Sequence, residues 1–174
     1  TVNGAKPVEN PMVRKMPEEL PLEVAMRYAL RHFVVKRDAW NTVIAGYPWF
    51  LDWGRDTLIC LRGLIPCGFV DESREIIHQF AQFEHNGTLP NIIHGKDVSN
   101  RDTSDAPLWL FTAVKDYTVN AGNNDILSMD CNGRTLLETL RSIIEHYRKG
   151  TENGIKMDAE SGLIFSPSHF TWMD

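Results

Sequence analysis

Apolar residues recur every three or four positions in five stretches of the chain, and this spacing predicts amphipathic helices. The first stretch, residues 18–35, predicts one helix. A second helix is expected from about Asp56 to Pro66 or Cys67, with Asp56 able to cap its N-terminus. A third follows directly, with Asp71 as its cap. The buried stripe of this third helix is expected to contain Ile76, Ile77, Phe80 and Ala81.

Two further helices follow in the second half of the chain. A fourth is expected to begin near residues 104–107, because a hydroxyl cap and a proline in the first turn both suit a helix start. Its inward positions are predicted to be Leu108, Phe111, Val114 and Tyr117. The fifth runs from about Arg134 to Lys149 and stops at Gly150. Its apolar stripe is predicted to be Leu136, Leu137, Leu140, Ile143, Ile144 and Tyr147.

The segments outside these helices are predicted to be a linker, a loop and short β-structure. Residues 1–17 contain three prolines and few apolar residues, which predicts an extended linker. A short β-like piece covers 42–44, and residues 86–103 are rich in turn formers, which indicates a long surface loop. Alternation around residues 155–165 predicts a small β-hairpin. The fold class is therefore mainly α, with antiparallel helical pairs that form either a bundle or a toroid of helical hairpins.

Composition and charge exclude several classes of protein. An apolar content of 43% over 174 residues is enough for the core of one domain or part of one. The net charge of −5, with both signs interspersed, offers no basic stripe for nucleic acid. No apolar run is long enough to span a membrane and no signal peptide is visible, so we expect a cytoplasmic protein that binds no membrane. The expected reduced cysteines are Cys60, Cys67 and Cys131.

Neither a metal nor a cofactor is predicted. The six histidines are scattered without metal-ligand spacing, and glycine-rich phosphate loops are absent from the sequence. The chemically richest segment is instead residues 47–57, which concentrates aromatic rings, carboxylates and a guanidinium. Neutral sugars bind such mixtures, because their C–H faces pack on aromatic rings and their hydroxyls need charged hydrogen-bond partners. A purely structural alternative stays open, in which Asp56 caps a helix, Arg55 pairs with it and the aromatic rings fill the core.

Four motifs in order carry a resemblance to a known family. They are GYPWFLDWGRDT at 46–57, GTLPN at 87–91, DAPLW at 105–109 and FTWMD at 170–174. Together they make the chain, over roughly residues 28–174, resemble the glucosidase domain of glycogen debranching enzymes. One departure is Arg101-Asp102-Thr103, where the family often has Tyr-Asn-Thr.

The resemblance implies a fold and a reaction. The fold would be an (α/α)6 toroid, of which residues 18–174 would be the N-terminal half. The reaction would be hydrolysis of α-1,6-linked glucose at branch points of an α-glucan such as glycogen or limit dextrin. Related glucosidases invert the anomeric configuration with an acid and a base about 6.5–9.5 Å apart. The base would belong to the second half, so we expect the isolated chain to have no turnover.

The resemblance also implies roles for individual residues. Asp174 would be the general acid, with its pKa raised in a closed pocket. Arg55 and Asp56 would bind glucose hydroxyls, and Trp53 and Trp172 would form walls of the subsite. Asp105 and Trp109 would also bind substrate, although Asp105 could equally be a first-turn acid of a helix.

Two alternatives remain at this stage. The chain could be a non-catalytic carbohydrate-binding or assembly half-domain, and exposed helix faces would then favour self-association. It could also be a related six-hairpin glucosidase with another linkage specificity, although the pairing of the WGRDT and TWMD motifs argues against that.

Overall fold

The computed structural model describes residues 20–172, so the predicted linker 1–17 and the predicted general acid Asp174 lie outside the described residues. The helices are α1 Leu22–Arg31, α2 Gly54–Leu64, α3 Val70–Ala81, α4 Ala106–Ala121, the 3-10 helix η1 Asp125–Ser128 and α5 Leu136–Lys149. The strands are β1 Val34–Arg37, β2 Trp40–Val43, β3 Asp52–Trp53, β4 Ile92–Ile93, β5 Lys156–Met157 and β6 Ile164–Phe165. The predicted mainly α fold class is confirmed.

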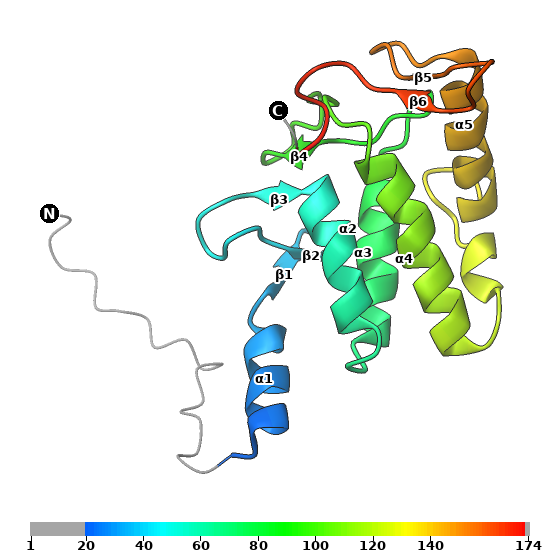
Figure 1. Ribbon diagram of the computed structural model, residues 1–174. Helices are drawn as coiled ribbons and strands as arrows, with labels where there is room; N and C mark the ends of the chain where they lie inside the picture. Colours follow the sequence, from blue (N-terminus) through cyan, green and yellow to red (C-terminus); the bar gives the residue numbers. More distant parts are fainter. Residues whose placement is uncertain (1–19, 173–174) are drawn as a thin grey trace, which may run out of the picture.

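Helices α2, α3 and α4 stand side by side, and α5 packs at the side of this group (Figure 1). Helices α2 and α4 begin at the same end of the group, whereas α3 runs the opposite way. The short strands β3 and β4 and the last described residues lie at this end too (Figure 1). The fold therefore collects two helix N-termini, a two-stranded ladder and the C-terminal segment in one region.

The core between these helices is made of large aliphatic and aromatic side chains. Fully buried members include Leu58, Leu61, Ile76, Ile77, Phe80, Leu110, Leu136 and Ile143. Four of the predicted inward positions of α4 and α5 are instead partly or largely open, and among them Leu108, Leu137 and Ile144 are exposed. The described part of the chain covers each of these helices on one side, so the outer positions of their wide apolar stripes face solvent. Within residues 20–172, no helix is both long and apolar enough to cross a membrane.

The first predicted helix is wrong at its C-terminal end. It was expected to reach residue 35, but α1 ends at Arg31 and residues 34–37 form β1, which pairs antiparallel with β2. The β-branched pair Val34-Val35 favours a strand, and Asp38, with φ of 51°, forms the tight turn that closes the hairpin. The apolar stripe of α1 is also open, because Leu22 is 76% exposed.

The predicted aspartate caps are also wrong. Trp53 and Phe69 occupy the N-cap positions of α2 and α3, and neither side chain makes a capping hydrogen bond. Asp56 and Asp71 lie inside the first turns, where a carboxylate interacts favourably with the helix dipole. The first backbone N–H of α2 needs no side-chain cap, because Gly54 N donates to the Asn91 carbonyl at 2.9 Å.

The predicted hairpin near the C-terminus is confirmed. Strands β5 and β6 pair antiparallel, with Lys156 opposite Phe165 and Met157 opposite Ile164. The proline predicted for the first turn of the fourth helix is confirmed as well. The hydroxyl that reaches this helix belongs to Thr103, whose Oγ1 accepts from Ala106 N at 3.3 Å.

A capping box begins α5, and it allows a direct test. The Thr135 hydroxyl accepts from the Glu138 backbone, and the Glu138 carboxylate accepts from Thr135 N at 2.8 Å. Replacing Thr135 with alanine is expected to lower the free energy of unfolding by about 1 kcal/mol, measured by urea denaturation. These hydrogen bonds lower the pKa of Glu138, so the stability they add is present at neutral pH and is lost as the pH falls through that pKa. A Thr135→Ala variant whose stability equals that of Thr135→Ser would contradict this prediction.

Candidate functional site

An ion pair joins the N-termini of α2 and α4. Arg55, in the first turn of α2, donates from Nε to Oδ2 of Asp105 at 2.5 Å. The other carboxylate oxygen of Asp105 accepts from the Thr103 hydroxyl at 3.0 Å. Asp105 precedes the first residue of α4, so two residues that are 50 positions apart meet where the two helices begin. This pair forms the centre of the candidate site.

Trp172 lies against the same guanidinium. The Arg55 guanidinium carbon is 6.0 Å from the centre of the Trp172 ring, within the range of a cation–π contact. Trp172 is 73% exposed, so much of its indole surface is free to pack on a ligand. The segment that carries it is tied to α4, because Ser104 N donates to the Phe170 carbonyl at 2.9 Å. The hydroxyls of Ser104 and Ser166 add a bond of 2.8 Å.

The other predicted site residues occupy different positions around this pair. Trp53 directly precedes α2 and is partly exposed. Asp56 is also partly exposed, and its carboxylate makes no hydrogen bond or ion pair with the residues between 20 and 172. Its carboxylate is therefore available to a ligand. Trp109, one turn into α4, packs against the hydrophobic core and serves the fold at least as much as the site.

The structural alternative for residues 47–57 does not fit this geometry. Arg55 pairs with Asp105 rather than with Asp56, and Asp56 does not cap α2. The aromatic residues of the preceding loop do not fill the described core either, since Trp49 is 81% exposed and Tyr47 and Phe50 are exposed as well. The loop therefore places its aromatic rings at the surface, whereas Asp52 in the same segment is buried.

The loop expected to lie on the surface is in part a buried support for the site. Residues 87–90 are buried, and β4 pairs with β3 so that Trp53 lies opposite Ile92. Gly54 touches this loop closely, because a Cβ on it would lie 2.6 Å from the Pro90 carbonyl oxygen. The loop thus presses directly on the start of α2.

Two charged residues brace this loop, and the sequence reasoning assigned neither of them this role. Arg101 donates to the carbonyls of Thr88 and Phe83 at 3.0 and 2.8 Å, and burial lowers its pKa. Glu84 accepts from Gly87 N at 2.8 Å and pairs with Arg134. The one sequence signal was the departure at Arg101 from the pattern of the resembling family. The Arg101 guanidinium binds carbonyls of the loop.

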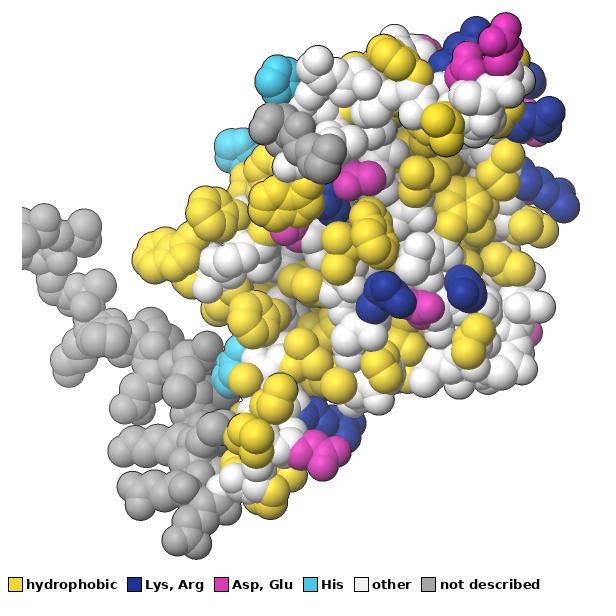
Figure 2. Space-filling model, in the orientation of Figure 1, with side chains coloured by type: hydrophobic (Ala, Val, Ile, Leu, Met, Phe, Trp, Pro, Cys, Tyr) yellow, Lys and Arg dark blue, Asp and Glu magenta, His cyan; other side chains and the backbone are white. Residues whose placement is uncertain are grey.

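The site is an open face. Figure 2 shows acidic and basic side chains close together in the upper left part of the body, with hydrophobic side chains around them. Two hollows on the described surface, of about 210 and 330 Å³, are lined by other residues and include neither Arg55 nor Asp105. Across residues 20–172, no cluster of three or more His, Cys, Asp or Glu side chains could hold a metal ion. The described residues thus supply one wall built from rings and fixed charges.

A buried tyrosine fixes the start of α4. The Tyr147 hydroxyl donates to the Ser104 carbonyl at 2.6 Å, and burial raises its pKa above the ordinary value of 10.0. Replacing Tyr147 with phenylalanine is expected to lower the free energy of unfolding by about 1–2 kcal/mol, because the buried carbonyl loses its partner.

The raised pKa adds a pH signature to this prediction. Its stabilising contribution is complete below the unfolded pKa near 10.0 and is lost as the pH rises towards the folded value. Urea denaturation across pH 7 to 11 should therefore show a smaller alkaline loss in Tyr147→Phe than in the wild type. Equal losses in the two proteins would contradict the assignment.

Comparison with known proteins identifies the family of the chain. A family model described as amylo-alpha-1,6-glucosidase matches residues 28–174. The glycogen debranching enzyme of Saccharomyces cerevisiae is 36% identical over 167 residues, a match that covers 70% of this chain and 11% of the yeast protein. The chain therefore spans about a tenth of the length of this curated relative. The matched region includes all the candidate site residues, and the chain belongs to the amylo-alpha-1,6-glucosidase family of glycoside hydrolases.

Proposed function

We propose that the chain forms part of the active site of a glycoside hydrolase that releases α-1,6-linked glucose from branch points of glycogen or limit dextrin. The observation that carries the proposal is the Arg55–Asp105 ion pair beneath the open indole of Trp172. Membership of the amylo-alpha-1,6-glucosidase family and the debranching activity named for the yeast relative support the choice of substrate.

The chemistry of the wall suits a neutral sugar. A glucose ring packs its C–H face on Trp172, with Trp53 as a second wall. Its hydroxyls bind Arg55, Asp56 and Asp105, which offer both donors and acceptors. The ion pair holds Arg55 in place before the sugar arrives, so little side-chain entropy is lost on binding.

The proposed reaction uses two carboxyl groups and inverts the anomeric centre. Asp174 protonates the leaving glycosidic oxygen, and Trp172, two positions before it, contacts the sugar. The general base that activates water is a carboxylate from a segment outside these 174 residues, about 6.5–9.5 Å from the acid. No cofactor takes part in this scheme.

We also propose an architecture for the domain. Residues 18–174 form the N-terminal half of an (α/α)6 toroid, and residues 1–17 are a linker. The exposed apolar side chains of α1, with Leu22 and Met26 among them, support the view that further helices cover this face. In their absence, we expect the chain to self-associate through it, which light scattering measures.

The test combines binding and turnover. Panose carries a terminal α-1,6-linked glucose, and calorimetry of the 174-residue chain is expected to show binding of panose in preference to the β-linked cellotriose. Glucose release from limit dextrin is expected only when the rest of the domain is present, because both carboxyl groups are needed. A chain that binds neither sugar, or binds both equally, would disprove the proposed function.

A further inference from the structure

A second ion pair lies buried behind the site and plays no part in the proposed chemistry. Arg37 on β1 donates from Nε and Nη2 to the two carboxylate oxygens of Asp52 on β3, each at 2.5 Å. The Asp52 side chain is 0% exposed and that of Arg37 is 16% exposed. The buried Thr42 hydroxyl on β2 adds a third bond to this carboxylate at 3.1 Å. The contact is a two-pronged, fully satisfied charge pair.

The same guanidinium reaches the loop that supports the site. Arg37 donates from Nη1 to the Gly95 carbonyl at 3.1 Å and from Nη2 towards the Ile93 carbonyl at 3.5 Å. One side chain therefore connects β1 with β3, β4 and the residues after β4. Its partner Asp52 is directly followed by Trp53, and Arg55 is three positions further on.

This connection is needed because the backbone ladder is short. Strands β3 and β4 pair over only two residues each, Asp52 with Ile93 and Trp53 with Ile92. A two-stranded ribbon of this length is unstable by its own hydrogen bonds. The Arg37 fork holds both strands from the side and so fixes where β3 delivers the chain to α2.

From these contacts we propose that Arg37 is a positioning residue of the sugar site, which acts through the buried carboxylate of Asp52 to place Trp53 and Arg55. This inference rests on the proposed function. It differs from a purely stabilising role, since replacing a buried ion pair with apolar residues often leaves stability unchanged or raised. The apolar replacement cannot reproduce the hydrogen bonds from Arg37 to the carbonyls of Ile93 and Gly95.

Three variants separate positioning from stability. Arg37→Met leaves the buried Asp52 carboxylate without its ion-pair partner, and we expect both the free energy of unfolding and the sugar affinity to fall. The triple variant Arg37→Met, Thr42→Val and Asp52→Leu removes every polar member, and we expect its urea midpoint to return towards that of the wild type. Its affinity for panose should stay roughly tenfold weaker, because Trp53 and Arg55 are no longer held in the binding geometry before the sugar arrives.

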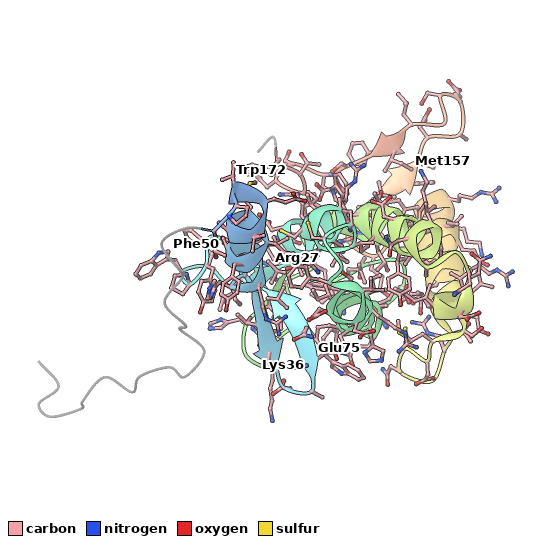
Figure 3. All side chains as sticks on the ribbon, turned by 90° about the horizontal axis from the view of Figure 1, so that it is seen from below. Arg27, Lys36, Phe50, Glu75, Met157 and Trp172 are labelled. Atoms are coloured by element: carbon pink, nitrogen blue, oxygen red, sulfur yellow. The ribbon has the colours of Figure 1, made fainter. Side chains whose placement is uncertain are left out.

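The matched control is Lys36→Met on the same strand. Lys36 pairs with Glu75 at 2.8 Å in an exposed contact, and Figure 3 shows both residues on the opposite side of the molecule from Trp172. This variant should leave stability and panose affinity unchanged.

Calorimetry with panose, urea denaturation and the indole N–H signal of Trp53 in NMR spectra complete the test. We expect the Trp53 signal to shift in Arg37→Met and in the triple variant, and not in Lys36→Met. A triple variant with wild-type affinity and an unmoved Trp53 signal would overturn the inference. If the wild type binds no panose, the proposed function fails, and the sugar-free Trp53 signal still decides whether Arg37 positions this residue.

Discussion

Replacing Gly54 with alanine is expected to lower the free energy of unfolding by about 3 kcal/mol, close to the upper end for overpacking a core. The added Cβ would lie 2.6 Å from the Pro90 carbonyl oxygen and 3.3 Å from the Cβ of Ala106. Backbone atoms cannot rotate away as a flexible side chain can, so the loop or the helix start must move. That movement also breaks the bond from Gly54 N to the Asn91 carbonyl.

The control for this substitution lies on the same helix. Gly63 has open space around the position of its missing Cβ, and its backbone lies inside α2. Gly63→Ala is therefore expected to raise stability slightly, by up to about 1 kcal/mol, through the better helix propensity of alanine. Urea denaturation of the two variants measures the contrast. Equal midpoints for Gly54→Ala and Gly63→Ala would show that the loop does not constrain the start of α2.

Local signals in the sequence were enough to predict most helices. The fifth helix was expected at 134–149 from its apolar stripe and Gly150, and it lies at Leu136–Lys149. Its start is two residues later than expected, because the capping box of Thr135 and Glu138 begins it. The first helix failed where Val34 continued the apolar spacing, since three- and four-residue periodicity does not distinguish a helix end from the start of a short strand. The hairpin partner β2, which decides this, lies outside any local window.

The candidate site could be predicted only in part for the same reason. The motifs flagged Arg55, Asp105 and Trp172, but nothing in their spacing says that the first two pair or that the third lies over them. Asp56 next to Arg55 was the local choice of partner, and tertiary packing brings Asp105 instead. The Arg37–Asp52 fork carries no sequence signal, because its energetics depend on burial that four strands create together.

The role of the aromatic loop could not be decided from its sequence. Its composition fitted both a core and a sugar site, and only the exposure of Trp49 and its neighbours separates the two within the described residues. Exposed aromatic rings favour a ligand or a covering segment over a core. Sugar binding is therefore best tested at Arg55, the charged residue that contacts the exposed ring of Trp172.

Arg55→Ala is expected to weaken panose binding by about 10- to 100-fold, the value of one or two hydrogen bonds to a charged group. The change removes the donors for sugar hydroxyls and the cation under Trp172, and it leaves Asp105 without its ion-pair partner. Arg55→Lys should recover little of the lost panose affinity, because a lysine ammonium group cannot form the planar, two-pronged hydrogen bonds of a guanidinium or stack against the indole. Calorimetry with panose measures each affinity.

A matched arginine on the same helix separates this effect from a general loss of charge. Arg62 also lies on α2 and pairs with Asp116 of α4 at 3.2 Å, but it lies in the last turn of the helix, away from Trp172. Arg62→Ala removes the same charge and a second, more exposed ion pair of α2, and its panose affinity should equal that of the wild type. If both variants lose affinity equally, the ion pairs serve helix packing alone. If only Arg55→Ala loses it, the sugar is bound where α2 and α4 begin.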